Sequence, residues 1–316
     1  MGAHGENLPV LRQLNGIPLQ YLSTSPVRDD ATNNRLTQQV TNPFAGLLPG
    51  TGLNGTSVQR NQLLRPYPQF TSIQATETNG ISDFQAMQAR VERRMANGFT
   101  VQVAYSWSRA MIEAAIPTIN LTGFLNDFDE KPERVISPFD RTHTFVTSGL
   151  VELPFGHNRR FGNDWGGVTN TLLGGWQVGY IFKAQSGAPL GFGNFLFAEG
   201  MGVDDIMADD PTVDQWFNVN AFNRVPAQQL VSNVRTQPSR FDEVRGPGYA
   251  VLDLSFLKNV SLGGNRQLQF RIEAYNALNR TNLQNPNTAV TNSALGTITA
   301  QNGFPRQIQL AVKVSF

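Results

Sequence analysis

The amino-acid sequence predicts an all-β fold of long antiparallel strands, and three observations support that prediction. Several segments of about ten residues alternate apolar and polar side chains, which is the period of a β-strand with two different faces. Tight-turn sequences such as Asn97-Gly98 and Gly263-Gly264 join some of these segments. Long polar stretches rich in Asn, Gly and Pro join the others. We therefore expect a sheet with short connections at one end and long connections at the other.

The C-terminal stretch 305–316 shows the alternation most clearly. Every second position is apolar and the chain ends on an aromatic residue, the row being Ile308, Leu310, Val312, Val314 and Phe316. A soluble strand averages about five or six residues, whereas a tilted strand that crosses a bilayer needs about nine to eleven. The pattern predicts the last strand of an antiparallel transmembrane β-barrel, and the row resembles the C-terminal assembly signal of outer-membrane β-barrel proteins. The edge strand of a soluble β-sandwich is the alternative.

The composition agrees with a barrel and excludes several other classes. The chain has 316 residues, and its Lys+Arg count of 25 is balanced by an Asp+Glu count of 24, so we expect no nucleic-acid partner. It has no cysteine, which excludes thiol catalysis and thiolate metal sites. No run of about eighteen apolar residues occurs, so no transmembrane helix is expected. Barrel strands escape that test because their apolar residues alternate with polar ones.

The periodicity divides the chain into two regions. Residues 1–69 show little alternation and many turn signals, so we expect a loop-rich N-terminal region, whereas residues 70–316 hold the barrel strands. A short strand is expected at 71–77, followed by a turn at Asn79-Gly80. The further expected strands are 83–94, 99–108, 141–153, 175–185, 249–260, 267–275 and 305–316.

The connections differ in length in the way that outer-membrane barrels require. Those at 109–140, 186–246 and 277–304 are long and are expected outside the cell, whereas the tight turns at 95–98 and 263–265 are expected in the periplasm. The connection 154–174 is long for a periplasmic turn and fits this scheme less well.

Each strand is expected to turn its apolar row to lipid and its polar row to the lumen. A lipid-facing Arg costs about 2–4 kcal/mol at the bilayer midplane, so charged side chains belong inside. The lumen-facing candidates are Arg90, Glu92, Arg271, Glu273 and Lys313. Tyr and Trp in the apolar rows suit an interfacial belt, and the aromatic girdle candidates are Tyr105, Trp107, Trp176 and Tyr180.

No group of residues points to catalysis, a cofactor or a metal. The histidines His4, His143 and His157 do not share a metal-ligand spacing, and no nucleophile elbow, zincin motif or P-loop occurs. The acidic run 204–214 lacks the spacing and the glycine of an EF-hand, so solvated loop charge is the better interpretation. We expect a protein that is not an enzyme and that uses no cofactor.

Several stretches resemble a known family, in the same order along the chain. They are ISDFQAMQARVERRMANGFTVQVAYSWSRA, FDRTHTFVTSGLVELPFG, LLGGWQVGYIFKAQSGAPL, RGPGYAVLDLSFLKNVSL, LQFRIEAYNALNRTNLQNPNT and PRQIQLAVKVSF. Together with the terminal Phe316 they resemble the C-terminal barrel of TonB-dependent outer-membrane receptors of the Oar-like type, which carry a carboxypeptidase-regulatory-like domain. The N-terminal GAHGENLPV resembles the end of an earlier barrel strand.

The resemblance implies a barrel of about 22 strands with a plugged lumen, of which this chain would supply about 8–10. It implies the outer membrane of a Gram-negative bacterium, uptake of an unidentified small ligand, and insertion into the lipid bilayer by the barrel-assembly machinery. TonB would be a partner of the full-length protein only.

The N-terminus has neither the basic nor the apolar region of a signal peptide, so we interpret the chain as a C-terminal fragment. Counting strands back from Phe316 then requires an odd number of crossings within 11–69. An autonomous small barrel, acting as a pore or a surface-binding protein, is the alternative.

Overall fold

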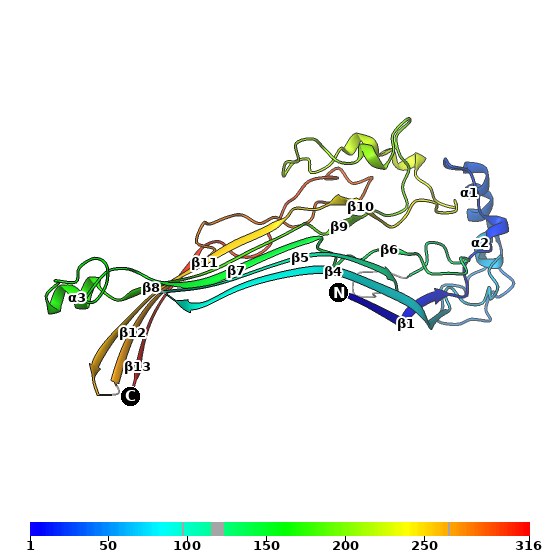
Figure 1. Ribbon diagram of the computed structural model, residues 1–316. Coiled ribbons are helices and arrows are strands. Elements are labelled where there is room, and N and C mark those ends of the chain that lie inside the picture. Colours follow the sequence, from blue (N-terminus) through cyan, green and yellow to red (C-terminus); the bar gives the residue numbers. More distant parts are fainter. Residues whose placement is uncertain (97, 115–122, 265) are drawn as a thin grey trace.

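The computed structural model of the chain describes residues 1–96, 98–114, 123–264 and 266–316. In this part of the chain one antiparallel sheet dominates, and it is twisted, curved and open (Figure 1). The strands of its main path, in both spatial and chain order, are β1 (Gly2–Gln13), β4 (Gln74–Ala96), β5 (Phe99–Glu113), β7 (His143–Glu152), β8 (Trp176–Gln185), β11 (Tyr249–Gly263), β12 (Arg266–Tyr275) and β13 (Gln307–Ser315). The predicted all-β, antiparallel fold is confirmed, and β1 and β13 are the two edges of the sheet.

The smaller elements lie in the connections. β6 (Val135–Ile136) pairs with β5. Two small sheets pair β2 (Gln39–Thr41) with β3 (Ser57–Gln59) and β9 (Pro189–Gly191) with β10 (Arg240–Arg245). The helices are α1 (Asp30–Thr37), α2 (Arg60–Leu63) and α3 (Gly167–Leu173), with 3-10 turns at Leu19–Tyr21, Val203–Asp205, Val219–Ala221 and Pro226–Gln228. Within the described ranges, no helix is long and apolar enough to span a membrane.

The sheet has a turn end and a loop end, which lie at the left and the right of Figure 1. At the turn end Ala96 pairs with Phe99 and Gly263 with Arg266, so both hairpins are tight. The turn residues Asn97 and Asn265 fall outside the described residues. The connection 153–175, which carries α3, also lies at the turn end. The loop end carries the connections 14–73, 114–142, 186–248 and 276–306.

β4 corrects the predicted N-terminal strands. The turn expected at Asn79-Gly80 does not form, and β4 runs through it without a break. Gly80 lies opposite Leu8 at an irregularity in the β1–β4 register, and a Cβ at Gly80 would lie 2.5 Å from the Glu113 carbonyl oxygen. The glycine therefore allows neighbouring backbones to approach closely at a bulge. An Asn-Gly pair is compatible with either a bulge or a turn, so the sequence alone does not distinguish the two.

β1 agrees with the resemblance of GAHGENLPV to the end of an earlier barrel strand, in an N-terminal region that was expected to be rich in loops. It pairs with β4 from Gly2 opposite Gln85 to Gln13 opposite Gln74, so it covers only the loop-end half of that strand. In the described part of 14–73, no strand joins the main sheet. The expectation that 11–69 holds an odd number of membrane-crossing strands is therefore wrong. It counted two strands within 71–94, whereas the structure has the single strand β4 there.

The main hydrophobic core lies in the loop-end connections. It is formed by Leu190, Phe192, Phe195, Ile206, Phe217, Ala221, Phe222, Phe241, Val244, Val290 and Leu295. Phe192 alone packs against four other phenyl rings, at centroid distances of 5.0 to 6.2 Å. This unit, residues 186–248 with 286–298, is named the cap. The sequence patterns predicted only loops in both stretches.

Candidate functional site

Two rows of side chains follow the strands on opposite faces of the sheet. Phe270 of β12 lies opposite Val312 of β13, and their neighbours Gln269 and Lys313 form the adjacent pair. Because successive side chains of a strand alternate between faces, this register separates an apolar row from a polar row. The apolar row includes Met87, Ala89, Val91, Val101, Val103, Tyr105, Trp107, Val151, Val178, Tyr180, Phe182, Leu254, Phe256, Leu268, Phe270, Ile272, Leu310, Val312 and Val314.

The apolar row has limits along each strand. On β5 it runs from Phe99 to Trp107 and then changes to Arg109, and on β4 it stops at Met87. Such a stretch is about nine residues long, which for strands tilted as in barrels approaches the apolar band of about 25 Å that spans an outer membrane. Beyond it, at the loop end, the same face becomes charged.

The charged continuation of this face centres on Asp83 of β4. One carboxylate oxygen of Asp83 lies 2.6 Å from His4 Nδ1, and the other accepts a hydrogen bond from Arg134 Nη2 at 2.6 Å. Arg134 also donates to Glu113 at 3.1 Å. The sequence patterns did not predict this cluster, because its members come from three strands, β1, β4 and β5, and from the connection that follows β5.

The predicted lumen-facing residues all lie in the polar row. Arg90 donates to Glu92 at 2.9 Å on β4, and Arg271 donates to Glu273 at 3.5 Å on β12. Lys313 lies in the same row on β13. These contacts place charged side chains side by side in the polar row of β4 and β12, and that this row lines a lumen is a prediction.

The girdle candidates occupy different heights on the sheet. Tyr105 and Trp107 lie toward the loop end, where the Tyr105 hydroxyl is 2.8 Å from His143 Nδ1. Trp176 begins β8 at the turn end and donates its indole N–H to the Leu172 carbonyl at 3.0 Å. Tyr180 lies in the middle of β8 opposite Gly149, away from both ends of the band.

The row predicted as an assembly signal lies along the free edge of the sheet. Ile308, Leu310, Val312 and Val314 belong to β13, and Phe316 follows its last residue. Leu310 is 75% and Phe316 92% exposed. So much exposed apolar surface on an edge strand indicates a surface that is covered in the membrane or by another strand.

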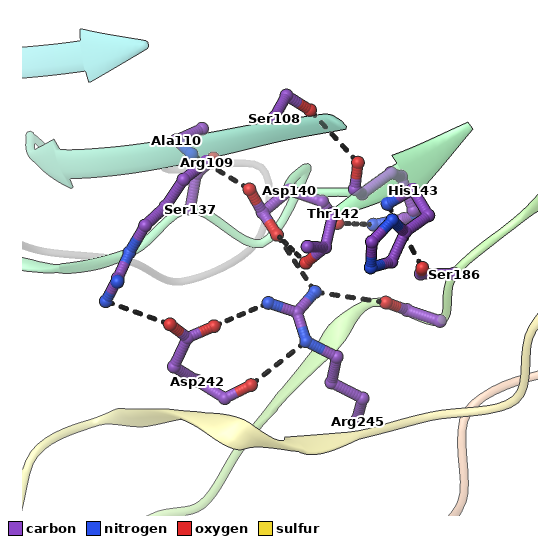
Figure 2. A network of polar contacts seen from close by, with 12 residues as sticks. Ser108, Arg109, Ala110, Ser137, Asp140, Thr142, His143, Ser186, Asp242 and Arg245 are labelled. Atoms are coloured by element: carbon purple, nitrogen blue, oxygen red, sulfur yellow. Dashed lines mark hydrogen bonds and ion pairs between the residues drawn. The ribbon is translucent and has the colours of Figure 1, made fainter. Parts of the chain in front are cut away.

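An ion-pair network with a buried carboxylate at its centre fastens the cap to the sheet. Arg245 of β10 donates to Asp140 at 2.9 Å and to Asp242 at 2.5 Å, and Arg109 of β5 donates to Asp242 at 2.9 Å (Figure 2). Asp140 is almost fully buried and also accepts the Ala110 backbone N–H at 2.8 Å. The carboxylates and guanidinium groups are paired within the network, so it holds the cap in place and offers no free group for chemistry.

A polar cavity lies where three loop-end connections meet. It has a volume of about 360 Å³, and its lining includes Arg65, Asn126, Asp127, Asn233 and Arg235. Asn126 donates to the Arg235 carbonyl at 3.1 Å and accepts its backbone N–H at 2.8 Å, which ties the second and third connections together. Burial lowers the pKa of the Arg235 guanidinium. The cavity presents charges of both signs and is large enough for a small polar ligand.

The histidines and the acidic run take up ordinary structural contacts. His157 Nδ1 donates to the Asn163 carbonyl at 3.1 Å, and Asp205 accepts the Gly202 N–H at 2.7 Å. Among the residues that the structure describes, no group of three or more His, Asp or Glu side chains is arranged to hold a metal.

Comparison with known families places the chain. A sequence model of the outer membrane beta barrel domain family matches residues 1–309. The chain belongs to this family. No curated protein and no solved structure matches it significantly. The expected location in the outer membrane of a Gram-negative bacterium is confirmed.

As an outer membrane beta barrel domain, the protein has strands that cross the bilayer, which is consistent with a transporter or a pore. Its sheet departs from a complete barrel, because the described strands do not close. The sheet thus has one apolar and one polar face, and the cap stands at its loop end.

Proposed function

We propose that the chain forms part of the wall and the outer surface of a ligand-importing receptor barrel, and that it performs no catalysis. The open sheet supports this most strongly. From Met87 to Arg93, β4 pairs with β5 on one side and with no described residue on the other. An open edge in lipid leaves backbone groups unpaired at a cost of several kcal/mol each, so further strands are needed beside β4 and β13.

The finer proposal is a TonB-dependent receptor of the Oar-like type, with a barrel of about 22 strands. The ordered sequence stretches that resemble that family support it, together with charged side chains in the polar row that suit a wide lumen. In this arrangement the turn end lies in the periplasm and the loop end faces outward, as the connection lengths favour. TonB would act on the full-length receptor, and the barrel-assembly machinery would insert it.

The imported ligand would first meet the loop end. The cavity at Arg65, Asp127 and Arg235 is the described site best suited to hold a small polar molecule, because it combines charged groups with a volume of about 360 Å³. The buried core of the cap keeps this surface rigid, which lowers the entropy cost of binding. We propose neither a nucleic-acid partner nor a cofactor.

A self-contained pore is the second candidate, and strand direction favours it. β1 and β13 run antiparallel to each other through the alternating order of the sheet, so their pairing is topologically allowed. Closure would, however, leave the turn-end half of β4 without a partner, because β1 reaches only to Gln85.

Engineered cysteine pairs separate the two candidates cleanly, since the chain has no cysteine of its own. Gly2→Cys with Leu310→Cys tests closure through β1, because Gly2 lies opposite Gln85 on the same face as the apolar row, and Val91→Cys with Val312→Cys tests closure through β4. We expect neither pair to form a disulfide in the reconstituted chain, and we expect no stable conductance in planar bilayers. Rapid disulfide formation together with a stable conductance would contradict the receptor proposal and support the self-contained pore.

The nucleotide sequence upstream of Met1 tests the finer proposal. An open reading frame that continues upstream and encodes a plug domain and a signal sequence is the expected result. A stop codon in frame, with no such domains before it, would contradict the TonB-dependent receptor.

A further inference from the structure

Lys258 interrupts the apolar row of β11. Its Cα lies opposite Trp176 of β8 on one side and Phe270 of β12 on the other, so the side chain leaves the sheet between two aromatic neighbours. The residue is only 6% exposed. A cation at this place needs an explanation, because the apolar row is the surface that faces lipid.

The ammonium group of Lys258 is only partly satisfied. Within the described ranges, its one hydrogen-bond acceptor is the backbone carbonyl of Gly174, in the link from α3 to β8. An ammonium group has three N–H donors, so two remain available. A charge held among apolar side chains is costly unless an opposite charge pairs with it, and no described carboxylate does so here. The site therefore favours an anion.

An apolar groove of about 610 Å³ begins at Lys258. Its floor is the apolar row of β12 and β13, including Phe270 and Leu310, and Leu172 of α3 lies on its other side. The groove is continuous with the surface that meets the bilayer. An aliphatic chain suits such a lining, whereas a polar solute does not.

The connection 153–175 explains why the groove exists at all. This turn-end connection is longer than the two tight hairpin turns beside it. It contains α3, which lies against β11 and β12 and forms one side of the groove. Val168 of α3 is 77% exposed, which suits a helix that rests in the interfacial zone of a membrane.

We propose that this groove binds a phospholipid at the turn end of the sheet, with an acyl chain along β12 and β13 and the phosphate paired with Lys258. Continuity with the lipid-facing row identifies the hydrocarbon part of the ligand. Charge complementarity identifies the phosphate part. The inference depends on membership of the outer-membrane barrel family and is independent of any TonB-dependent transport.

Native mass spectrometry of the full chain, released from detergent, tests the proposal by titration with phosphatidylglycerol. The wild type should retain one phosphatidylglycerol more tightly than a lipid without phosphate, diacylglycerol. Lys258→Gln should weaken that binding about tenfold or more, since hydrogen bonds to a charged group are lost, and Lys258→Arg should preserve most of it. Lys313→Gln, which removes a lysine from the polar row of β13, is the matched control and should bind normally.

Two further measurements complete the test. Leu172→Trp keeps Lys258 but fills the groove, so it should also lose the lipid while leaving the circular dichroism spectrum unchanged. Inorganic phosphate at millimolar concentration should not displace the lipid. Equal retention by Lys258→Gln and wild type, or full displacement by inorganic phosphate, would overturn the phospholipid site.

Discussion

Asp140 and Arg245 form an ion pair of 2.9 Å between two loop-end connections whose partners are 105 residues apart. The Asp140 side chain is 1% exposed. Its carboxylate also accepts the Ala110 N–H of β5 at 2.8 Å and the Thr142 hydroxyl at 3.2 Å. Because one buried carboxylate joins the cap, the 137–142 turn and the sheet, it fixes the position of the cap over the loop end of the wall.

Arg245→Ala should release the cap. Removing one partner of a buried ion pair costs about 3–5 kcal/mol, because the other charge stays buried without its counter-ion. We expect faster amide hydrogen exchange over 186–248, with little change in β12 and β13. Arg90→Ala is the control, since it removes an exposed ion pair with Glu92 that contributes about 0–1 kcal/mol. Identical exchange in the cap of both variants would show that the network does not hold it.

The core of the cap should be sensitive to loss of a single ring. Phe217 is fully buried and packs edge-on against Phe192 at 5.4 Å, so Phe217→Ala should cost the cap about 3–5 kcal/mol. Phe304→Ala removes a ring that is 77% exposed and should cost far less. Near-ultraviolet circular dichroism and hydrogen exchange of the cap report the difference. Equal losses would mean that the phenyl cluster is not the stabilising core.

Acidification should loosen the N-terminus of α1. The Asp29 carboxylate accepts the Thr32 backbone N–H at 2.9 Å and its hydroxyl at 2.8 Å, and these hydrogen bonds lower the pKa of Asp29 below its ordinary value. A carboxyl group with a lowered folded pKa stabilises the fold above its unfolded pKa, and that stabilisation is lost as the pH falls through the folded pKa.

The measurement is hydrogen exchange of the α1 amides, corrected for the intrinsic pH dependence of exchange. Protection should decrease as the pH falls from about 5 to below the ordinary Asp pKa of about 4. Asp29→Asn retains a capping side chain but has no charge to titrate, so its protection should be independent of pH. A pH dependence that persists in Asp29→Asn would assign it to another group.

Alternation alone was enough to predict the strands that cross the membrane. Expected strands 99–108, 175–185 and 267–275 correspond to β5, β8 and β12 within a few residues, because a membrane strand must separate apolar from polar side chains at every step. The N-terminal region was harder. The Asn79-Gly80 pair predicts a turn, but Gly80 lies at a bulge within β4. β1 has too few apolar residues to show the alternation of a strand.

The loop-end site could not be predicted from periodicity at all. Asp140 pairs with Arg245, and Asn126 with Arg235, across more than a hundred residues, and no local pattern encodes such contacts. The stretches around Phe192 and Phe217 did carry a usable signal in their density of aromatic residues. A polar surface loop has little reason to contain so many phenyl rings, so that density indicates a buried core.

The assignment of the two faces can be tested residue by residue. We predict that Leu254, Phe270, Val103, Leu310 and Val312 face lipid, and that Gln102, Gln269, Arg271, Gln309 and Lys313 face the lumen. The register supports the split, since Phe270 lies opposite Val312 and Gln269 lies opposite Lys313 on the β12–β13 pair. Single cysteines at the second set should react with a membrane-impermeant maleimide in reconstituted vesicles, and those at the first set should not.

Arginine substitutions at two adjacent positions of β5 test the same assignment of faces through the free energy of unfolding. Val103 and Gln102 are neighbours on one strand, so their side chains lie on opposite faces and the two substitutions place the same charge on opposite faces of the sheet. Val103→Arg places a charge in hydrocarbon near the middle of the apolar band and should destabilise the folded state by about 2–4 kcal/mol, whereas Gln102→Arg joins the polar row beside Glu92 and should be nearly neutral. Urea titrations in lipid vesicles, followed by tryptophan fluorescence, measure both. If the two variants unfold at the same urea concentration, the apolar row does not face the membrane, and if Gln102→Arg unfolds first, the barrel wall is turned the other way.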